Sequence, residues 1–164
     1  MITGKWLILG IFGLAFVAAA AAWVHRYYRT DFVRDRFGTA ALQLVESSPQ
    51  VEAIARYGET ESGRKDVTRA PGMLNIRHML GSDFSYPEQE PQEMTLPTQW
   101  DLIFQDGQKS VTLGFHHDCK AVMLKEGGAT ATINDAAAQH LRAFFAEQFP
   151  QESESMNRHW KVAK

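Results

Sequence analysis

The sequence has few of the residues that build reactive or cross-linked sites. Cys119 is the only cysteine among 164 residues, so no intrachain disulfide can form, which fits a reducing compartment. A net charge of −2, from 17 basic and 19 acidic side chains, gives no basic surface for nucleic acid. No GxGxxG or GxxxxGK loop, no CxxC or HxxxH pair and no internal repeat occurs. No cofactor is therefore predicted.

The longest uncharged stretch lies near the start of the chain, at residues 6–24. It contains no charge, proline or amide. As a helix it would rise about 28 Å, close to the ~30 Å hydrocarbon core of a bilayer. The pattern predicts a transmembrane helix preceded by a short tail at 1–5. The alternative is a cleaved signal peptide, because the alanines at 18–22 offer small-residue cleavage sites.

Aromatic and basic side chains gather at the two ends of this stretch. Aromatic rings favour the headgroup region, and an excess of basic residues favours the cytoplasmic side. The sequence therefore predicts a single-pass protein of the cell (inner) membrane whose carboxy-terminal part is cytoplasmic. The expected interface residues are Trp6, Trp23, Arg26, Tyr27, Tyr28 and Arg29.

Small residues follow one side of the same predicted helix. Pairs of small residues four positions apart let a second helix approach closely, so the stripe predicts packing against other transmembrane subunits. The alternative is that alanine is merely tolerated in a spanning helix. The stripe consists of Ala15, Ala18, Ala19 and Ala22.

The rest of the chain divides into a juxtamembrane helical region at 25–58, a domain at 59–150 and a polar tail at 151–164. Apolar spacing predicts a helix over 30–45, and Ser48-Pro49 predicts a second one ending at Gly58. Residues 59–71 read as a polar loop. Residues 72–80 fit either a strand with Leu74 facing inward or a short helix.

Alternating apolar residues define the strands of the domain. Residues 100–105 and 110–115 alternate on either side of Asp106-Gly107, a strong hairpin signal. Further strands are expected at 121–124 and 129–133, and Asn134 is expected to cap a helix that Pro150 ends. The predicted fold class is α+β: a transmembrane helix, short helices, a small antiparallel β-meander and a C-terminal covering helix.

An acidic, proline-containing loop at 81–99 is the most unusual of the polar stretches. Prolines keep such a segment extended and limit the entropy that it loses on ordering. It fits an arm that docks on a partner, and the alternative is a solvated surface loop. The expected docking residues are Phe84, Tyr86, Met94 and Leu96.

The sharpest chemical cluster is His116-His117-Asp118-Cys119. In an extended chain only two of these side chains share a face, whereas a structural zinc site takes four ligands. A thiol nucleophile would need a neighbouring imidazole such as His140, and no local signature surrounds the cysteine. The favoured interpretation is a corner between strands, so no catalytic or metal site is assigned. The weak metal candidates are His116, His117 and Cys119.

These features lead to an expected function without a specific activity. The sequence favours a non-enzymatic single-pass accessory or assembly subunit of a larger membrane protein complex, for example respiratory, photosynthetic or transport. Two alternatives stay open. One is a membrane-tethered metal- or thiol-dependent enzyme using the corner at 116–119, and the other is a membrane-anchored sensory or ligand-binding domain.

Overall fold

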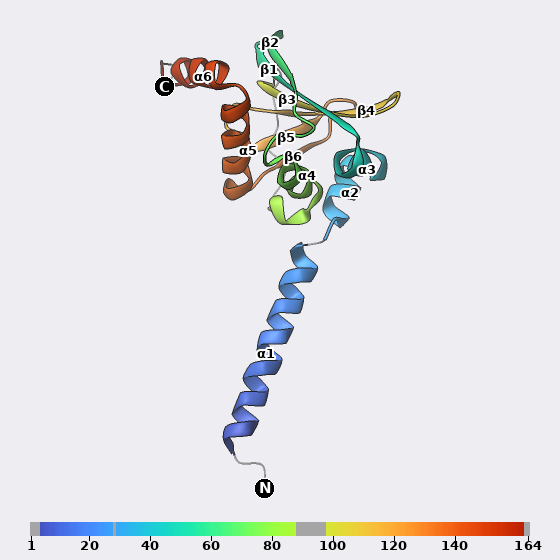
Figure 1. Cartoon of the computed structure of the whole chain (residues 1–164), viewed down its shortest axis with the longest axis vertical. Helices are drawn as coiled ribbons and strands as arrows, with labels where there is room; N and C mark the ends of the chain where they lie inside the picture. Colours follow the sequence, from blue (N-terminus) through green and yellow to red (C-terminus); the bar gives the residue numbers. More distant parts are fainter. Residues whose placement is uncertain (1–3, 28, 88–97, 163–164) are drawn as a thin grey trace.

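The protein folds as an α+β domain from which one long helix extends (Figure 1). In this computed structural model the backbone is described for residues 4–27, 29–87 and 98–162. Side chains are described for residues 10–25, 29–87, 98–156 and 158. The α+β class and the covering helix expected from the sequence are present, and the sheet is larger than the expected meander.

Six strands in the described part of the chain form one antiparallel sheet in the order β2-β1-β3-β4-β5-β6. The hairpin between β3 and β4 turns at Gly107, whose φ of +58° suits glycine. The strands are β1 Gln50–Tyr57, β2 Thr60–Asp66, β3 Trp100–Asp106, β4 Lys109–Phe115, β5 Ala121–Leu124 and β6 Thr130–Thr132.

One face of the sheet carries the main core. Leu102 of β3 lies opposite Ala53 of β1 and Leu113 of β4, and all three side chains are buried. Helices α3, α4 and α5 contribute buried side chains to the same core, and Trp100 stacks on Phe145 of α5 with ring centroids 4.9 Å apart. The helices are α1 Gly4–Tyr27, α2 Asp31–Phe37, α3 Thr39–Ser47, α4 Met73–Gly81, α5 Asp135–Gln148 and α6 Pro150–Val162, with a 3₁₀ turn η1 Asp83–Ser85.

The other face of the sheet contains a buried carboxylate. Asp101 is fully buried and accepts hydrogen bonds from Arg56 Nε at 2.5 Å, Lys125 Nζ at 2.8 Å and Thr98 Oγ1 at 2.8 Å. Two cations and a hydroxyl replace the water that the carboxylate loses. A Cβ on the neighbouring Gly114 would come within 2.6 Å of Thr98, so the segment before β3 lies directly across this strand.

Helix α4 settles the ambiguous stretch at 72–80. Its buried side chains recur at helical spacing, at positions 73, 76, 77 and 80, whereas Leu74 is 80% exposed. The strand interpretation with Leu74 inward is therefore wrong. Arg77 is buried and donates to the carbonyls of Val45 and Ser48, so it closes the end of α3.

Several other expectations fail where local signals mislead. Residues 50–57 form strand β1 instead of a helix, because Val51, Ala53 and Ala55 pack inward at a period of two. Residues 60–66 form the edge strand β2 instead of a loop. The helix expected at 30–45 breaks at Gly38, which has a φ of +87°. Helix α6 covers most of the predicted polar tail and does not contradict its polarity.

The expectation of a transmembrane helix at 6–24 is contradicted. No helix in the described part of the chain is both long and apolar enough to cross a bilayer. The single-pass assignment to the cell (inner) membrane, and the orientation argued from the flanking arginines, therefore lose their basis.

A carboxylate from η1 joins the long helix to the domain. Asp83 accepts hydrogen bonds from the backbone N–H groups of Phe32 and Val33, each at 3.1 Å, and so caps α2. Its own N–H donates to the carbonyl of Arg29 at 2.8 Å, and its carboxylate lies 3.7 Å from the Arg29 guanidinium. These contacts hold the segment from Arg29 to Val33, which follows α1, against η1.

Candidate functional site

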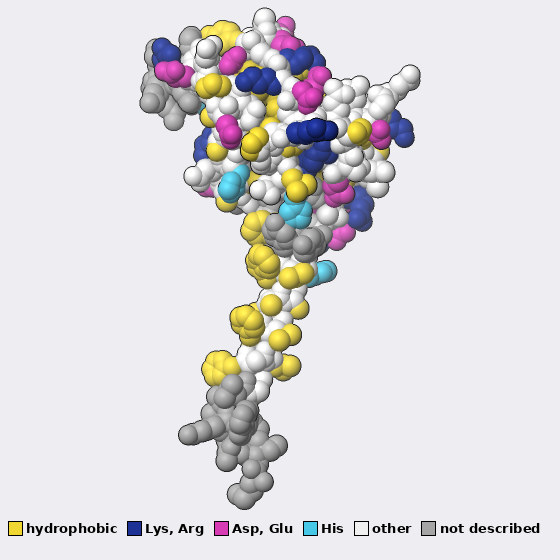
Figure 2. Space-filling view, viewed as in Figure 1, with side chains coloured by type: hydrophobic (Ala, Val, Ile, Leu, Met, Phe, Trp, Pro, Cys, Tyr) yellow, Lys and Arg dark blue, Asp and Glu magenta, His cyan; other side chains and the backbone are white. Residues whose placement is uncertain are grey.

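Helix α1 presents its apolar side chains outward along its described length. Figure 2 shows apolar side chains along the helix below the domain. Large side chains here are 46–76% exposed, whereas the domain buries most of its own. An exposed apolar surface of this kind is a candidate interaction site. The side chains concerned are Ile11, Phe12, Leu14, Phe16, Val17, Trp23 and Val24.

The alanine stripe expected from the sequence lies on this exposed helix. Ala15, Ala18, Ala19 and Ala22 are all exposed. Of the expected interface residues, Trp23 is 60% exposed, and Arg29 pairs with Asp31 at 3.3 Å beside the Asp83 contact. The side chains of Trp6, Arg26, Tyr27 and Tyr28 lie outside the described residues.

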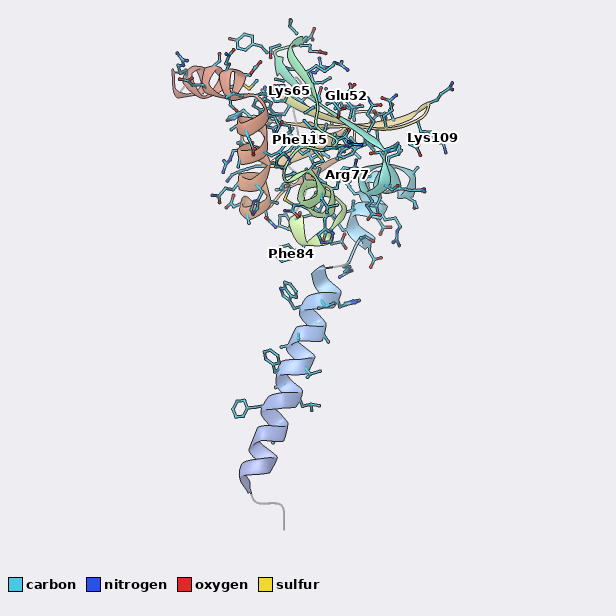
Figure 3. The ribbon with its side chains drawn as sticks, in the orientation of Figure 1. Glu52, Lys65, Arg77, Phe84, Lys109 and Phe115 are labelled. Carbon is cyan, nitrogen blue, oxygen red and sulfur yellow. The ribbon has the colours of Figure 1, made fainter. Side chains whose placement is uncertain are left out.

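The expected docking residues at 81–99 are found in different environments. Phe84 is 47% exposed and lies at the end of the domain nearest α1 (Figure 3). Tyr86 is 6% exposed, donates a hydrogen bond to the Leu80 carbonyl at 2.8 Å and packs near Phe32 and Phe37. It is a core residue with no surface to offer a partner. Met94 and Leu96 lie outside the described residues.

The cluster at 116–119 forms a turn instead of an extended strand. The N–H of Cys119 donates to the carbonyl of His116 at 3.0 Å, and the N–H of Lys120 donates to Asp118 Oδ1 at 3.1 Å. Cys119 takes a φ of +54°, which is unusual for a residue other than glycine. His117 is held from outside the turn, because its N–H donates to Gln99 Oε1 at 3.0 Å. The geometry matches a corner between β4 and β5.

The chemistry of this corner is unfavourable for a thiol nucleophile. The Cys119 side chain is fully buried, and burial raises the pKa of its thiol well above the usual range. The thiol therefore stays protonated at neutral pH. Across the described residues, no three His, Cys, Asp or Glu side chains gather in a way that could hold a metal ion.

A groove that the sequence did not predict lies between α4 and α5. It has a volume of about 540 Å³ and is lined mainly by apolar residues, with Ile76 and Met79 of α4 facing Phe144 of α5 and Phe84 of η1 at one end. His78 of α4 and His140 of α5 also line it. The two helices are some sixty residues apart in the sequence, so only the fold brings these side chains together.

No known protein family, curated protein or solved structure significantly matches this chain.

Proposed function

We propose that this chain is a non-enzymatic accessory subunit that joins a larger protein assembly through helix α1. The observation that supports the proposal is the exposure of the large apolar side chains of α1. Burying one such side chain contributes about 1.5–3 kcal/mol. Covering several of them on one side of the helix would provide a strong driving force for association.

The proposed partner is an apolar α-helix of another subunit. Residues 10–24 carry no charge, so a partner that contacts them needs no opposing charge. The alanine stripe allows two helix axes to come close to the lower limit of the usual 8–10 Å separation, which depends on the side chains at the contact. The larger side chains of α1 would then pack beside the stripe.

The chemistry of the folded domain supports a non-enzymatic role better than the enzymatic alternative. A thiol mechanism needs an accessible, ionised cysteine, and Cys119 is buried with a raised thiol pKa. None of the side chains from His116 to Cys119 lines the groove between α4 and α5. The assembly proposal needs no such site.

Two matched substitutions test the proposal. Ala19→Leu adds bulk on the alanine stripe, and Ala20→Leu adds the same apolar bulk about 100° further around the helix. Each full-length variant is purified from its native host in mild nonionic detergent. The stoichiometry of any bound protein is then measured by mass spectrometry of the intact complex. We expect wild type and Ala20→Leu to retain a partner in fixed stoichiometry and Ala19→Leu to lose it.

Three results would overturn the proposal. The first is that both variants retain the same partner. The second is that wild type is a monomer with no bound protein. The third is that the purified chain inserts equally well, with either leucine, into protein-free phospholipid vesicles, which would make lipid the natural cover of α1.

A further inference from the structure

The groove between α4 and α5 goes beyond the assembly role, since its lining lies in the folded domain and not on α1. Its volume of about 540 Å³ falls within the range of roughly 300–1,000 Å³ typical of small-molecule sites. Such sites combine apolar walls with a few convergent polar groups. The walls here include two aromatic rings and a methionine, which suit a ligand with an aromatic or aliphatic body.

One end of the groove presents hydrogen-bond donors. Ser85 is 2% exposed and lines the groove, and its hydroxyl forms no hydrogen bond within the described residues. In the described part of the chain, every polar side-chain atom that is fully enclosed has a hydrogen-bond partner. Because the Ser85 hydroxyl has no such partner, it is not fully enclosed, and the small exposed area of Ser85 includes it. The Ser85 carbonyl accepts from the N–H of Asn134 at 2.9 Å, which places this serine beside the start of α5. The hydroxyl is therefore available to donate to a ligand in the groove.

The start of α5 lies at the same end of the groove. Asn134 Oδ1 accepts from the N–H of Ala137 at 2.9 Å, and Asn134 Nδ2 donates to the carbonyl of Phe84 at 2.8 Å. The N–H of Ala136, which also lines the groove, has no acceptor among the described residues. Unsatisfied N–H groups and the helix dipole favour a negative group at this position.

The polar lining residues along α5 give the groove a direction. His140 lies one turn beyond Ala136 on the groove side of α5 and offers an imidazole N–H to an anion. Glu147, the one carboxylate in the described lining, is eleven residues beyond Ala136, about 16 Å along the helix axis. A ligand carboxylate is therefore attracted to the start of α5 and repelled from its far end.

We propose that the groove binds a small monocarboxylate with an apolar arylalkyl body. The carboxylate accepts hydrogen bonds from the Ser85 hydroxyl and the Ala136 N–H. The apolar body lies between Ile76 and Met79 of α4 and Phe144 of α5.

The test uses the full-length protein and two probes of matched shape. 4-Phenylbutyrate carries the carboxylate, and 4-phenylbutan-1-ol replaces it with a neutral hydroxyl. Binding to each is measured by titration calorimetry in mild nonionic detergent. We expect the carboxylate to bind and the alcohol to bind at least tenfold more weakly, since a hydrogen bond to a charged group is about twice as strong as a neutral one.

Variants separate the groove from the rest of the surface. Ala143→Phe fills the groove from an exposed position of α5, and Ala146→Phe adds the same ring at another exposed position of α5 that does not line it. We expect Ala143→Phe to abolish binding and Ala146→Phe to retain it. Ser85→Ala should weaken the carboxylate about tenfold and leave the alcohol unchanged.

Each contrary outcome overturns a stated part of the proposal. Equal affinity for the two probes removes the carboxylate assignment. Binding that survives Ala143→Phe, or is lost equally in Ala146→Phe, places the ligand elsewhere. If neither probe binds, the proposed ligand site is refuted. Each comparison is made within the purified chain, so none of them requires that α1 has a protein partner.

Discussion

The buried carboxylate of Asp101 gives a sharp test of the sheet. Asp101→Asn keeps the size of the side chain and removes its charge, so Arg56 and Lys125 lose their anionic partner. As a control, Asp106→Asn makes the same change at an exposed residue of the same strand. The control also keeps a favourable hairpin turn, because Asn-Gly and Asp-Gly are both preferred there.

The size of the effect depends on how deeply Asp101 and its two cationic partners are buried. Removing one partner of a buried ion pair destabilises a protein by about 3–5 kcal/mol. The side chains of Arg56 and Lys125 remain 26% and 28% exposed, so water can solvate them in part after the change. We therefore expect Asp101→Asn to lower the free energy of unfolding by about 3 kcal/mol, near the lower end of that range.

Cys119 supplies the assay. It is the only cysteine in the chain and is fully buried, so pulse alkylation in increasing urea reports the unfolding of this domain alone. With an m value of about 2 kcal/mol/M, the midpoint should fall by about 1.5 M for Asp101→Asn. Asp106→Asn should leave the midpoint almost unchanged. A loss below about 1 kcal/mol, or equal shifts in the two variants, would refute the assignment of a buried charge cluster.

Two further changes probe the packing of the helices and the corner at 116–119. Arg77→Met removes the hydrogen-bond donors at the end of α3 and should lower the free energy of unfolding by about 2 kcal/mol, measured by thermal melts. Arg77→Lys should not restore this stability, because a lysine lacks the planar guanidinium. Wild-type stability in Arg77→Lys would show that the two guanidinium contacts, with the Val45 and Ser48 carbonyls, are not needed. Burial raises the thiol pKa of Cys119, so on raising the pH the unfolded state loses the thiol proton before the folded state does. The free energy of unfolding of the wild type should therefore fall as the pH rises above about 8.5, by at most about 1.4 kcal/mol per pH unit. Melts of Cys119→Ala should lack that slope, and parallel profiles for the two proteins would show that this thiol is not the cause.

Local signals in the sequence are sufficient where one short segment determines its own structure. Asp106-Gly107 predicts the β3–β4 hairpin because few other dipeptides adopt that turn easily. Asn134 predicts the start of α5 because its side chain satisfies a nearby backbone N–H. Both predictions are confirmed, and both depend on contacts within a few residues.

The remaining features depend on contacts between distant segments. Strand β2 contains no apolar residue, so no hydrophobic pattern could reveal it, and it forms by pairing with β1 at the sheet edge. The sequence pattern predicts Tyr86 as a docking residue, yet it packs against α2, more than forty residues earlier. The groove could not be predicted because its two walls come from separate helices.

The three-residue turn η1 makes contact with parts of the chain that have different proposed roles. Asp83 contacts Arg29, which follows α1, and caps the start of α2, while the carbonyls of Phe84 and Ser85 accept hydrogen bonds from Asn134 at the start of α5. Any ligand that holds η1 more firmly would reduce the entropy lost when α1 engages a partner. By thermodynamic linkage the partner would then tighten ligand binding by the same factor. A single turn would thus transmit free energy between an assembly surface and a small-molecule site.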